Sequence, residues 1–188
     1  ATLFSTILGT LIAFALGRHR FKGRSGVNTL IFLPMATPEV VLGASLLAMF
    51  LTFKINPGFL TTVIAHVMFC ISFVVTTVKA RIASLDPRLE QAAMDLYANE
   101  FETFRRVTLP LVMPGIAAAA LLAFSLSFDD FIITNFNSGT LMTFPKFVYV
   151  ASARGIPAQA NVIGSSMFIL ALAIVIAGQF VGRKRKIS

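Results

Sequence analysis

Long runs of hydrophobic residues, separated by short polar segments, dominate the chain. A helix needs about 20 apolar residues to cross a bilayer, because every backbone polar group in the hydrocarbon must be hydrogen-bonded internally. Five runs meet or approach that length: Ala1–Gly17, Val27–Phe53, Phe59–Val78, Met113–Thr134 and Val162–Val181. The pattern therefore predicts an all-α fold, a polytopic transmembrane helical bundle with five spans.

Two features of the runs are typical of a packed membrane bundle. The second run contains Pro34 and Pro38, which would kink a helix in water but are tolerated where neighbouring helices supply partners for the freed carbonyls. Small residues recur at Gly9, Ala13 and Gly17, a spacing that lets two helix backbones approach closely. We interpret this stripe as packing between helices.

The distribution of charge predicts the orientation of the spans. The formal net charge is +8, and the basic residues form short clusters between apolar runs. This placement is typical of a membrane protein's topology signals, so we expect no nucleic-acid partner. With five spans, the clusters after the first, third and fifth runs share one side, and only Lys54, Lys146 and Arg154 lie on the other. The positive-inside rule makes the richer side, and the C-terminus, cytoplasmic. A chain that starts in the cytoplasm would then need one further helix before Ala1.

Composition and missing motifs exclude several function classes. The chain is 56% hydrophobic with a mean hydropathy of +0.83, too apolar for a soluble domain of this size. A single cysteine, Cys70, excludes an intramolecular disulfide, and its pairing with His66 four residues earlier offers two ligands, too few for a metal site. We interpret both as core residues. No phosphate-binding loop or catalytic triad is present, so we expect no enzyme and no cofactor in this chain.

The longest polar segment, residues 80–112, contains five of the eight acidic residues. Asp86 followed by Pro87 predicts the start of a short helix, because Asp caps helices and Pro suits the first helical position. Apolar residues then recur at helical spacing: Leu89, Ala92, Ala93 and Leu96. A second short helix is predicted to contain Phe101, Phe104 and Val107. We expect it to end where Pro110 and Pro114 interrupt the pattern.

A pair of amphipathic helices on the cytoplasmic side has three possible partners. It could lie on lipid, pack on its own bundle, or insert its apolar face into a groove of another protein. The acidic residues Glu90, Asp95, Glu100 and Glu102 would be repelled by anionic lipid. The pattern favours a protein partner.

This segment resembles the EAA loop of permease subunits of ATP-binding-cassette (ABC) importers. The family pattern is Glu-Ala-Ala, three residues, Gly, nine residues, Ile-x-Leu-Pro, and matching positions here are Gln91, Ala92, Ala93, Tyr97, Val107, Leu109 and Pro110. Gln91 replaces the glutamate, with Glu90 one position earlier as a substitute for its charge. Tyr97 replaces a glycine that permits a positive-φ turn. Either the turn is built differently here, or coupling is altered.

The resemblance implies an architecture and a set of partners. It implies a type I, MetI-like transmembrane domain over residues 1–188, in the bacterial inner membrane and in contact with its lipid. Residues 80–112 would be the ATPase-coupling loop, with Glu90 and Asp95 among its residues. The loop would dock on an ATP-binding subunit, present in two copies that hold ATP and Mg²⁺. A second homologous permease and an extracellular or periplasmic binding protein would complete the importer.

Dispersed matches over nearly the whole chain resemble the spermidine/putrescine permeases. They include residues 18–23 after the first run and residues 125–131 in the fourth. The resemblance implies that the transported substrate is a polyamine. Two alternatives stay open: a permease for an iron, sulfate or phosphonate species, and a membrane channel or scaffold without ATP coupling.

Ionisable residues inside the predicted spans are candidates for the substrate path, because charge in a bilayer is costly. Glu39 lies in the second run, and Asp129 and Asp130 lie near the outer end of the fourth. Carboxylates would attract a polycation, and the aromatic faces of Phe128 and Phe131 would add cation–π contacts. The alternative for Asp129 and Asp130 is a polar helix end wetted by solvent.

Overall fold

The computed structural model describes residues 1–19, 21–152, 155, 158–159, 161–169 and 173. These residues are helical or lie in connecting segments, and they contain no strand, so the all-α prediction is confirmed for the described chain. Two compact units are present, Ala1–Thr143 and Phe144–Ser188.

The first unit holds most of the helices. They are α1 (Thr2–Arg18), α2 (Arg24–Ala36), α3 (Glu39–Thr52), α4 (Phe59–Ala83), α5 (Arg88–Asp95), α6 (Glu100–Thr103), a π-helical turn η1 (Phe104–Thr108), α7 (Leu109–Asp129) and α8 (Ile132–Asn137). The second unit contains α9 (Phe144–Ser152) and helical residues 161–169.

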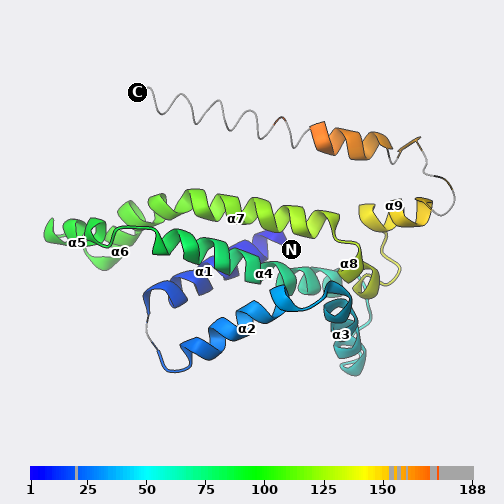
Figure 1. The fold of residues 1–188 in the computed structure, drawn as a ribbon, viewed down its shortest axis with the longest axis horizontal. Helices are drawn as coiled ribbons and strands as arrows, with labels where there is room; N and C mark the ends of the chain where they lie inside the picture. Colours follow the sequence, from blue (N-terminus) through cyan, green and yellow to red (C-terminus); the bar gives the residue numbers. More distant parts are fainter. Residues whose placement is uncertain (20, 153–154, 156–157, 160, 170–172, 174–188) are drawn as a thin grey trace. The chain divides into compact units, whose positions relative to one another are not determined.

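Helix α4 forms the centre of the first unit, with α1 and α7 packed along it (Figure 1). Buried apolar side chains from the three helices form the core, among them Ala13, Leu16, Phe69, Val74, Val75, Val78, Ala119 and Ala123. Small residues let the helices approach. A Cβ on Gly9 would lie 2.6 Å from Cγ1 of Val74, and one on Gly115 would lie 2.5 Å from Cγ of Arg81. The predicted packing role of Gly9 and Ala13 is confirmed.

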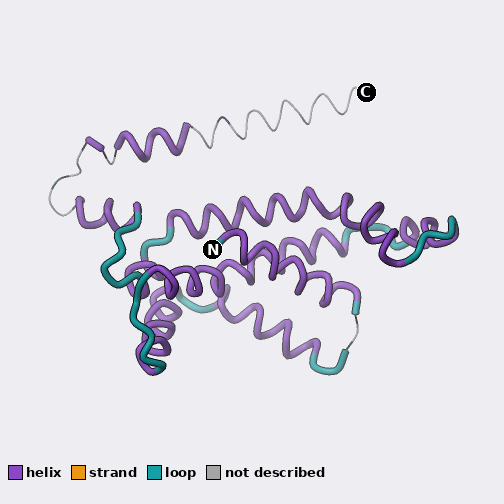
Figure 2. The backbone as a smooth tube through the Cα atoms, turned by 180° about the vertical axis from the view of Figure 1, so that it is seen from behind, coloured by secondary structure: helices purple, strands orange, loops and turns teal. Residues whose placement is uncertain are grey.

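The two ends of the first unit differ (Figures 1 and 2). At one end α5 and α6 lie beyond the packed helices, and at the other α3 and α8 come together. Asn137 is fully buried there, and its Nδ2 donates to the carbonyl of Gly43 over 3.2 Å. The Thr61 hydroxyl donates to the carbonyl of Asn137 over 2.8 Å. Helix α8 is therefore held by both α3 and α4.

Two helices of the described residues are long and apolar enough to cross a membrane, Phe59–Ala83 and the continuous stretch Glu100–Asp129. The third predicted span is thus confirmed as a helix and extends to Ala83. The first is an apolar helix of 17 residues, shorter than a usual span. Most of the fifth predicted span lies outside the described residues, and the part within 161–169 is helical.

The second predicted span is a broken helix. Helices α2 and α3 meet the length and hydropathy of a span only together, and they are bent by 109°. Pro34 lies inside α2, whereas the bend falls at Thr37, whose backbone is extended with φ −84° and ψ 131°. A residue before proline avoids the helical region, so Pro38 sets the position of the break.

The prediction that the second loop helix ends at Pro110 is wrong. The helix continues through η1 into α7, and the N–H of Leu109 donates to the carbonyl of Phe104, five residues earlier. Pro110 has no N–H to donate, and the widened π-helical turn lies just before it, where a proline interrupts the regular α-helical hydrogen bonds. The helix then ends at Asp129, short of the predicted Thr134, because Asp130 is extended with ψ 119°.

Gly9→Ala should destabilise the protein, because its Cβ would clash with Val74. We expect a loss of about 1–3 kcal/mol, typical of overpacking, seen as a lower melting temperature of the detergent-purified permease. Gly26→Ala is the matched control, since Gly26 is also helical and a Cβ there meets nothing within 4 Å. Equal melting temperatures for the two variants would contradict the close α1–α4 contact.

Candidate functional site

The segment between α4 and α7 extends beyond the end of the helix bundle (Figure 2). Asp86 Oδ1 accepts the N–H of Arg88 over 2.9 Å, and α5 begins at Arg88 with Pro87 as its N-cap, one residue later than predicted. Helix α6 begins with a reciprocal cap between Asn99 and Glu102, whose side chains each accept the other's backbone N–H. Our sequence analysis missed this cap, although Asn with Glu three residues later is its recognised signal.

Tyr97 lies between α5 and α6 with φ +65°, in the left-handed region. This is the backbone conformation that a glycine adopts without strain. The turn is therefore kept at the position of the family glycine, with a tyrosine in it. The Tyr97 side chain is 99% exposed and makes no contact that would offset the backbone strain.

Five large apolar side chains of the loop are exposed and do not pack on the bundle, whereas Phe104 packs on Phe14 of α1. The five are Leu89, Met94, Leu96, Tyr97 and Phe101. Gln91, Ala92 and Asp95 are exposed as well, and Ala93 is half-buried. Further along, Val107 and Leu109 are half-buried and Pro110 is exposed. The loop thus presents an apolar surface with acidic neighbours, and packing on its own bundle is excluded for these side chains.

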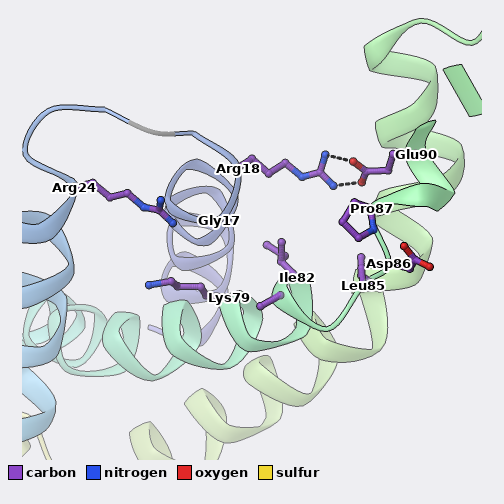
Figure 3. A pocket seen from close by; sticks show the side chains of 10 residues that line it. Gly17, Arg18, Arg24, Lys79, Ile82, Leu85, Asp86, Pro87 and Glu90 are labelled. Atoms are coloured by element: carbon purple, nitrogen blue, oxygen red, sulfur yellow. Dashed lines mark hydrogen bonds and ion pairs between the residues drawn. The ribbon is translucent and has the colours of Figure 1, made fainter.

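Glu90 is turned in another direction, toward the end of α1 (Figure 3). Arg18 Nη1 donates to Glu90 Oε2 over 2.6 Å, and Arg18 Nη2 donates to Oε1. The Thr108 hydroxyl also donates to Oε1, over 2.5 Å. The hydrogen bond from Arg18 is the main reason that the pKa of Glu90 is below its usual value, and it outweighs the opposing effect of burial. Glu90 therefore does not supply, on the exposed surface, the negative charge that is lost where Gln91 replaces the family glutamate.

A pocket of about 460 Å³ lies beside the Arg18–Glu90 pair (Figure 3). Its lining includes cations from three helices, Arg18, Arg24 and Lys79. Lys79 Nζ donates to Asn28 Oδ1 over 2.7 Å, which ties α4 to α2. Close by on α4, Arg81 Nε and Nη2 donate to the carbonyl of Leu111 over 3.0 and 2.9 Å, which ties α4 to α7.

The carboxylate of Asp130 is buried, with 8% of the residue exposed. It accepts the N–H groups of Ile133 and Thr134 over 3.3 and 2.8 Å, and so caps α8. The solvent-wetted alternative does not hold for Asp130. The side chain of its neighbour Asp129 is exposed and makes no hydrogen bond or ion pair within the described chain.

His66 joins α4 to the break between α7 and α8. Its Nδ1 lies 2.8 Å from Ser127 Oγ, and its Nε2 lies 2.8 Å from Thr134 Oγ1 and 3.4 Å from Asp130 Oδ2. Both ring nitrogens thus have protein partners. Cys70 is fully buried, so the interpretation of both residues as core residues is confirmed. The described residues contain no group of three potential metal ligands.

The remaining predicted path residues lie near the α3–α8 end. Glu39 is exposed in the first turn of α3, one turn before the Gly43 that contacts α8. Phe128 is half-buried and stacks on Phe124 with ring centroids 5.7 Å apart, and Phe131 is half-buried. Glu39 and Asp129 are therefore the two predicted carboxylates that are exposed at this end.

Comparisons with known proteins give a consistent result. The sequence model of the family described as binding-protein-dependent transport system inner membrane component matches residues 5–183. The spermidine/putrescine transport system permease protein PotC of Escherichia coli (strain K12) is 37% identical over 183 residues, which are 97% of this chain and 69% of that protein.

Two further relatives have similar identity. PotC of Haemophilus influenzae is 36% identical over 185 residues, 98% of this chain and 72% of the relative. The putrescine transport system permease protein PotI of Escherichia coli (strain K12) is 37% identical over 173 residues, 88% of this chain and 62% of the relative.

Tyr97→Gly should stabilise the α5–α6 turn by about 1 kcal/mol, because the left-handed region costs an L-residue about 1–2 kcal/mol and the exposed side chain gives up no contact. The measurement is hydrogen exchange of the Tyr97 and Ala98 amides, which donate to Met94 and Ala93. Tyr97→Ala is the control, since it removes the ring and keeps Cβ. Equal slowing of exchange in both variants would show that backbone strain is not the cause.

Proposed function

The chain belongs to the family of binding-protein-dependent transport system inner membrane components, the permeases of ABC transporters, and we propose that it takes up polyamines as one permease of an ATP-driven importer. The permease itself is not catalytic. The observation that carries the polyamine is the similarity to spermidine/putrescine and putrescine permeases, which covers up to 98% of this chain. A channel or scaffold without ATP coupling is excluded by the family.

We propose that the transmembrane domain, residues 1–188, crosses the bacterial inner membrane five times, with the C-terminus in the cytoplasm. The two long helices, the bent α2–α3 pair and the apolar α1 support the first four crossings. The clusters of Lys and Arg support the orientation, because they precede α2 and follow α4. Membrane lipid would contact the exposed apolar side chains of these helices.

We propose that residues 80–112 couple the permease to its ATPase. The family implies an ATP-binding partner, and the exposed apolar side chains of Leu96, Tyr97 and Phe101 supply a surface for it. Because this surface lies beyond the end of the bundle, a partner can reach it without disturbing the core. Two ATP-binding subunits would hold ATP and Mg²⁺, and a second homologous permease and an extracellular or periplasmic binding protein would complete the importer.

We propose that the substrate path passes the α3–α8 end of the bundle. Exposed carboxylates at Glu39 and Asp129 would attract a polycation. Phe128 precedes Asp129 and Phe131 follows two residues later, so their rings could add cation–π contacts. The buried Asp130 would contribute indirectly, because it fixes the helix break that places Asp129.

The substrate is tested in the complete transporter, reconstituted with its partner permease, ATPase and binding protein. ATP hydrolysis should rise when the binding protein is loaded with spermidine or putrescine. Sulfate, a phosphonate and an iron chelate are the comparison solutes, because permeases for such species were the alternative. Stimulation by one of these and not by an amine would overturn the polyamine proposal while leaving the permease role intact.

Substitutions at the helix break should separate transport from stability. Asp129→Asn should lower polyamine uptake at an unchanged melting temperature, because its carboxylate is exposed and makes no hydrogen bond or ion pair with the described residues. Asp130→Asn should lower the melting temperature, with a loss of about 1–3 kcal/mol in the free energy of unfolding. An amide NH₂ would replace one carboxylate oxygen and could not accept the hydrogen bonds from the N–H groups of Ile133 and Thr134. Full uptake by Asp129→Asn would remove Asp129 from the path.

A further inference from the structure

Three residues that are distant in the sequence meet at the base of the loop. Arg18 is the last residue of α1, Glu90 lies in the first turn of α5, and Thr108 is the last residue of η1. Glu90 accepts hydrogen bonds from both of the others, and Arg18 Nη2 also lies 3.4 Å from Thr108 Oγ1. We call these three residues the α1–loop contact.

The α1–loop contact is the polar link between α5 and the bundle. Within the described chain, the only side-chain hydrogen bonds from α5 to another helix are those of Glu90. Helix α5 otherwise packs on α6 and η1, which belong to the same loop. The large apolar side chains of α5 are exposed, so the polar contact of Glu90 is the link from α5 to α1. Movement of α5 would therefore reach α1 through Glu90 and Arg18.

Helix α1 is well placed to pass such a movement on. Gly9 leaves no free space against Val74, and Gly17 lies against Ile82, where a Cβ would come within 3.2 Å. An aromatic contact supports the same end, since the rings of Phe14 and Phe104 meet edge to face with centroids 5.3 Å apart. A displacement of Arg18 would therefore move α1 together with α4, because closely packed helices shift as rigid bodies.

The contact is also able to break and re-form. The Arg18 and Glu90 side chains are 34% and 21% exposed, and the pocket beside them gives the guanidinium room to turn away (Figure 3). A bidentate arginine–carboxylate pair fixes the relative orientation of its two partners while it lasts. Rotation of Arg18 toward solvent would release α5 without repacking the core, because both side chains of the pair are partly exposed.

We infer that Arg18 is a positioning residue that holds α5 through Glu90 and Thr108 and conveys the movement of the coupling loop to α1. This inference rests on the proposed role of residues 80–112, and it adds a route into the bundle that the exposed loop surface does not provide. Arg18 itself touches neither the ATPase nor the substrate in this scheme.

The test uses the reconstituted transporter with charge reversals at both ends of the pair. Arg18→Glu and Glu90→Arg should each lower the amount of substrate transported per ATP hydrolysed by about fivefold. The double reversal should restore the ratio to within about twofold of the unmodified complex, because it rebuilds the ion pair in the opposite sense. Basal ATP hydrolysis and the melting temperature of the complex are measured alongside.

Two further variants keep the test decisive. Lys22→Glu makes the same charge reversal in the α1–α2 connection, at an exposed cation that makes no hydrogen bond or ion pair with the described residues. It should leave the ratio of substrate transported to ATP hydrolysed unchanged. Thr108→Val removes one donor to Glu90 with no change in charge, and should lower the ratio by less than the reversals. If the reversals prevent assembly, Arg18→Gln and Thr108→Val give the answer: the first removes the charge and keeps a polar side chain, the second keeps the side-chain volume, and both should lower the ratio.

Two results would overturn the inference: single reversals that keep the ratio of the unmodified complex, or a double reversal that assembles normally and stays as uncoupled as the single ones. A transporter stimulated by a solute other than an amine would overturn only the proposed substrate, because the ratio can be measured with that solute. The two failures are thus distinguishable.

Discussion

The close contact between α1 and α4 is the constraint on which the rest of the first unit depends. Gly9 leaves only enough room for Val74, so the two helix axes cannot slide without a clash. This fixes the end of α1, and with it the position from which Arg18 reaches Glu90. Helix α7 packs on the same central helix through Gly115 and Arg81. Movement of the loop would therefore act on α1, α4 and α7 together, because their close contacts leave them little room to move separately.

The helix breaks are stabilised by polar groups within the chain, as a membrane setting requires. Asp130 accepts the free N–H groups at the start of α8, and His66 connects the same break to α4. At the loop, the π-helical turn carries the backbone past Pro110 without a separate cap. The break before α8 and the widened turn before α7 thus each have a local hydrogen-bonded solution.

Sequence alone predicted what depends on local pattern. The apolar run of α4 and the start of a helix close to Asp86 were readable from residues close in the chain, and the family pattern pointed to a positive φ at Tyr97 as one of two possibilities. The continuation of the helix through Pro110 and the burial of Asp130 were not predicted. The bend between α2 and α3 was not predicted either, although its position follows the local rule for a residue before proline. The burial of Asp130 depends on its contact with His66, and Arg18 meets Glu90 across 72 residues; periodicity cannot show either contact.

The basic residues that indicate the orientation of the chain also hold its helices together. Arg18 binds Glu90, Lys79 binds Asn28, and Arg81 binds the carbonyl of Leu111. Counting charges along the sequence treats these side chains as interchangeable cations facing the cytoplasm. In the fold each of the three has a different partner. Neutralising them to invert the membrane topology would therefore also remove the contacts of α1 with the loop, of α4 with α2 and of α4 with α7. Charge mutagenesis at these three positions therefore cannot separate insertion signals from tertiary contacts, whereas a cation such as the exposed Lys22 can be changed without losing a contact.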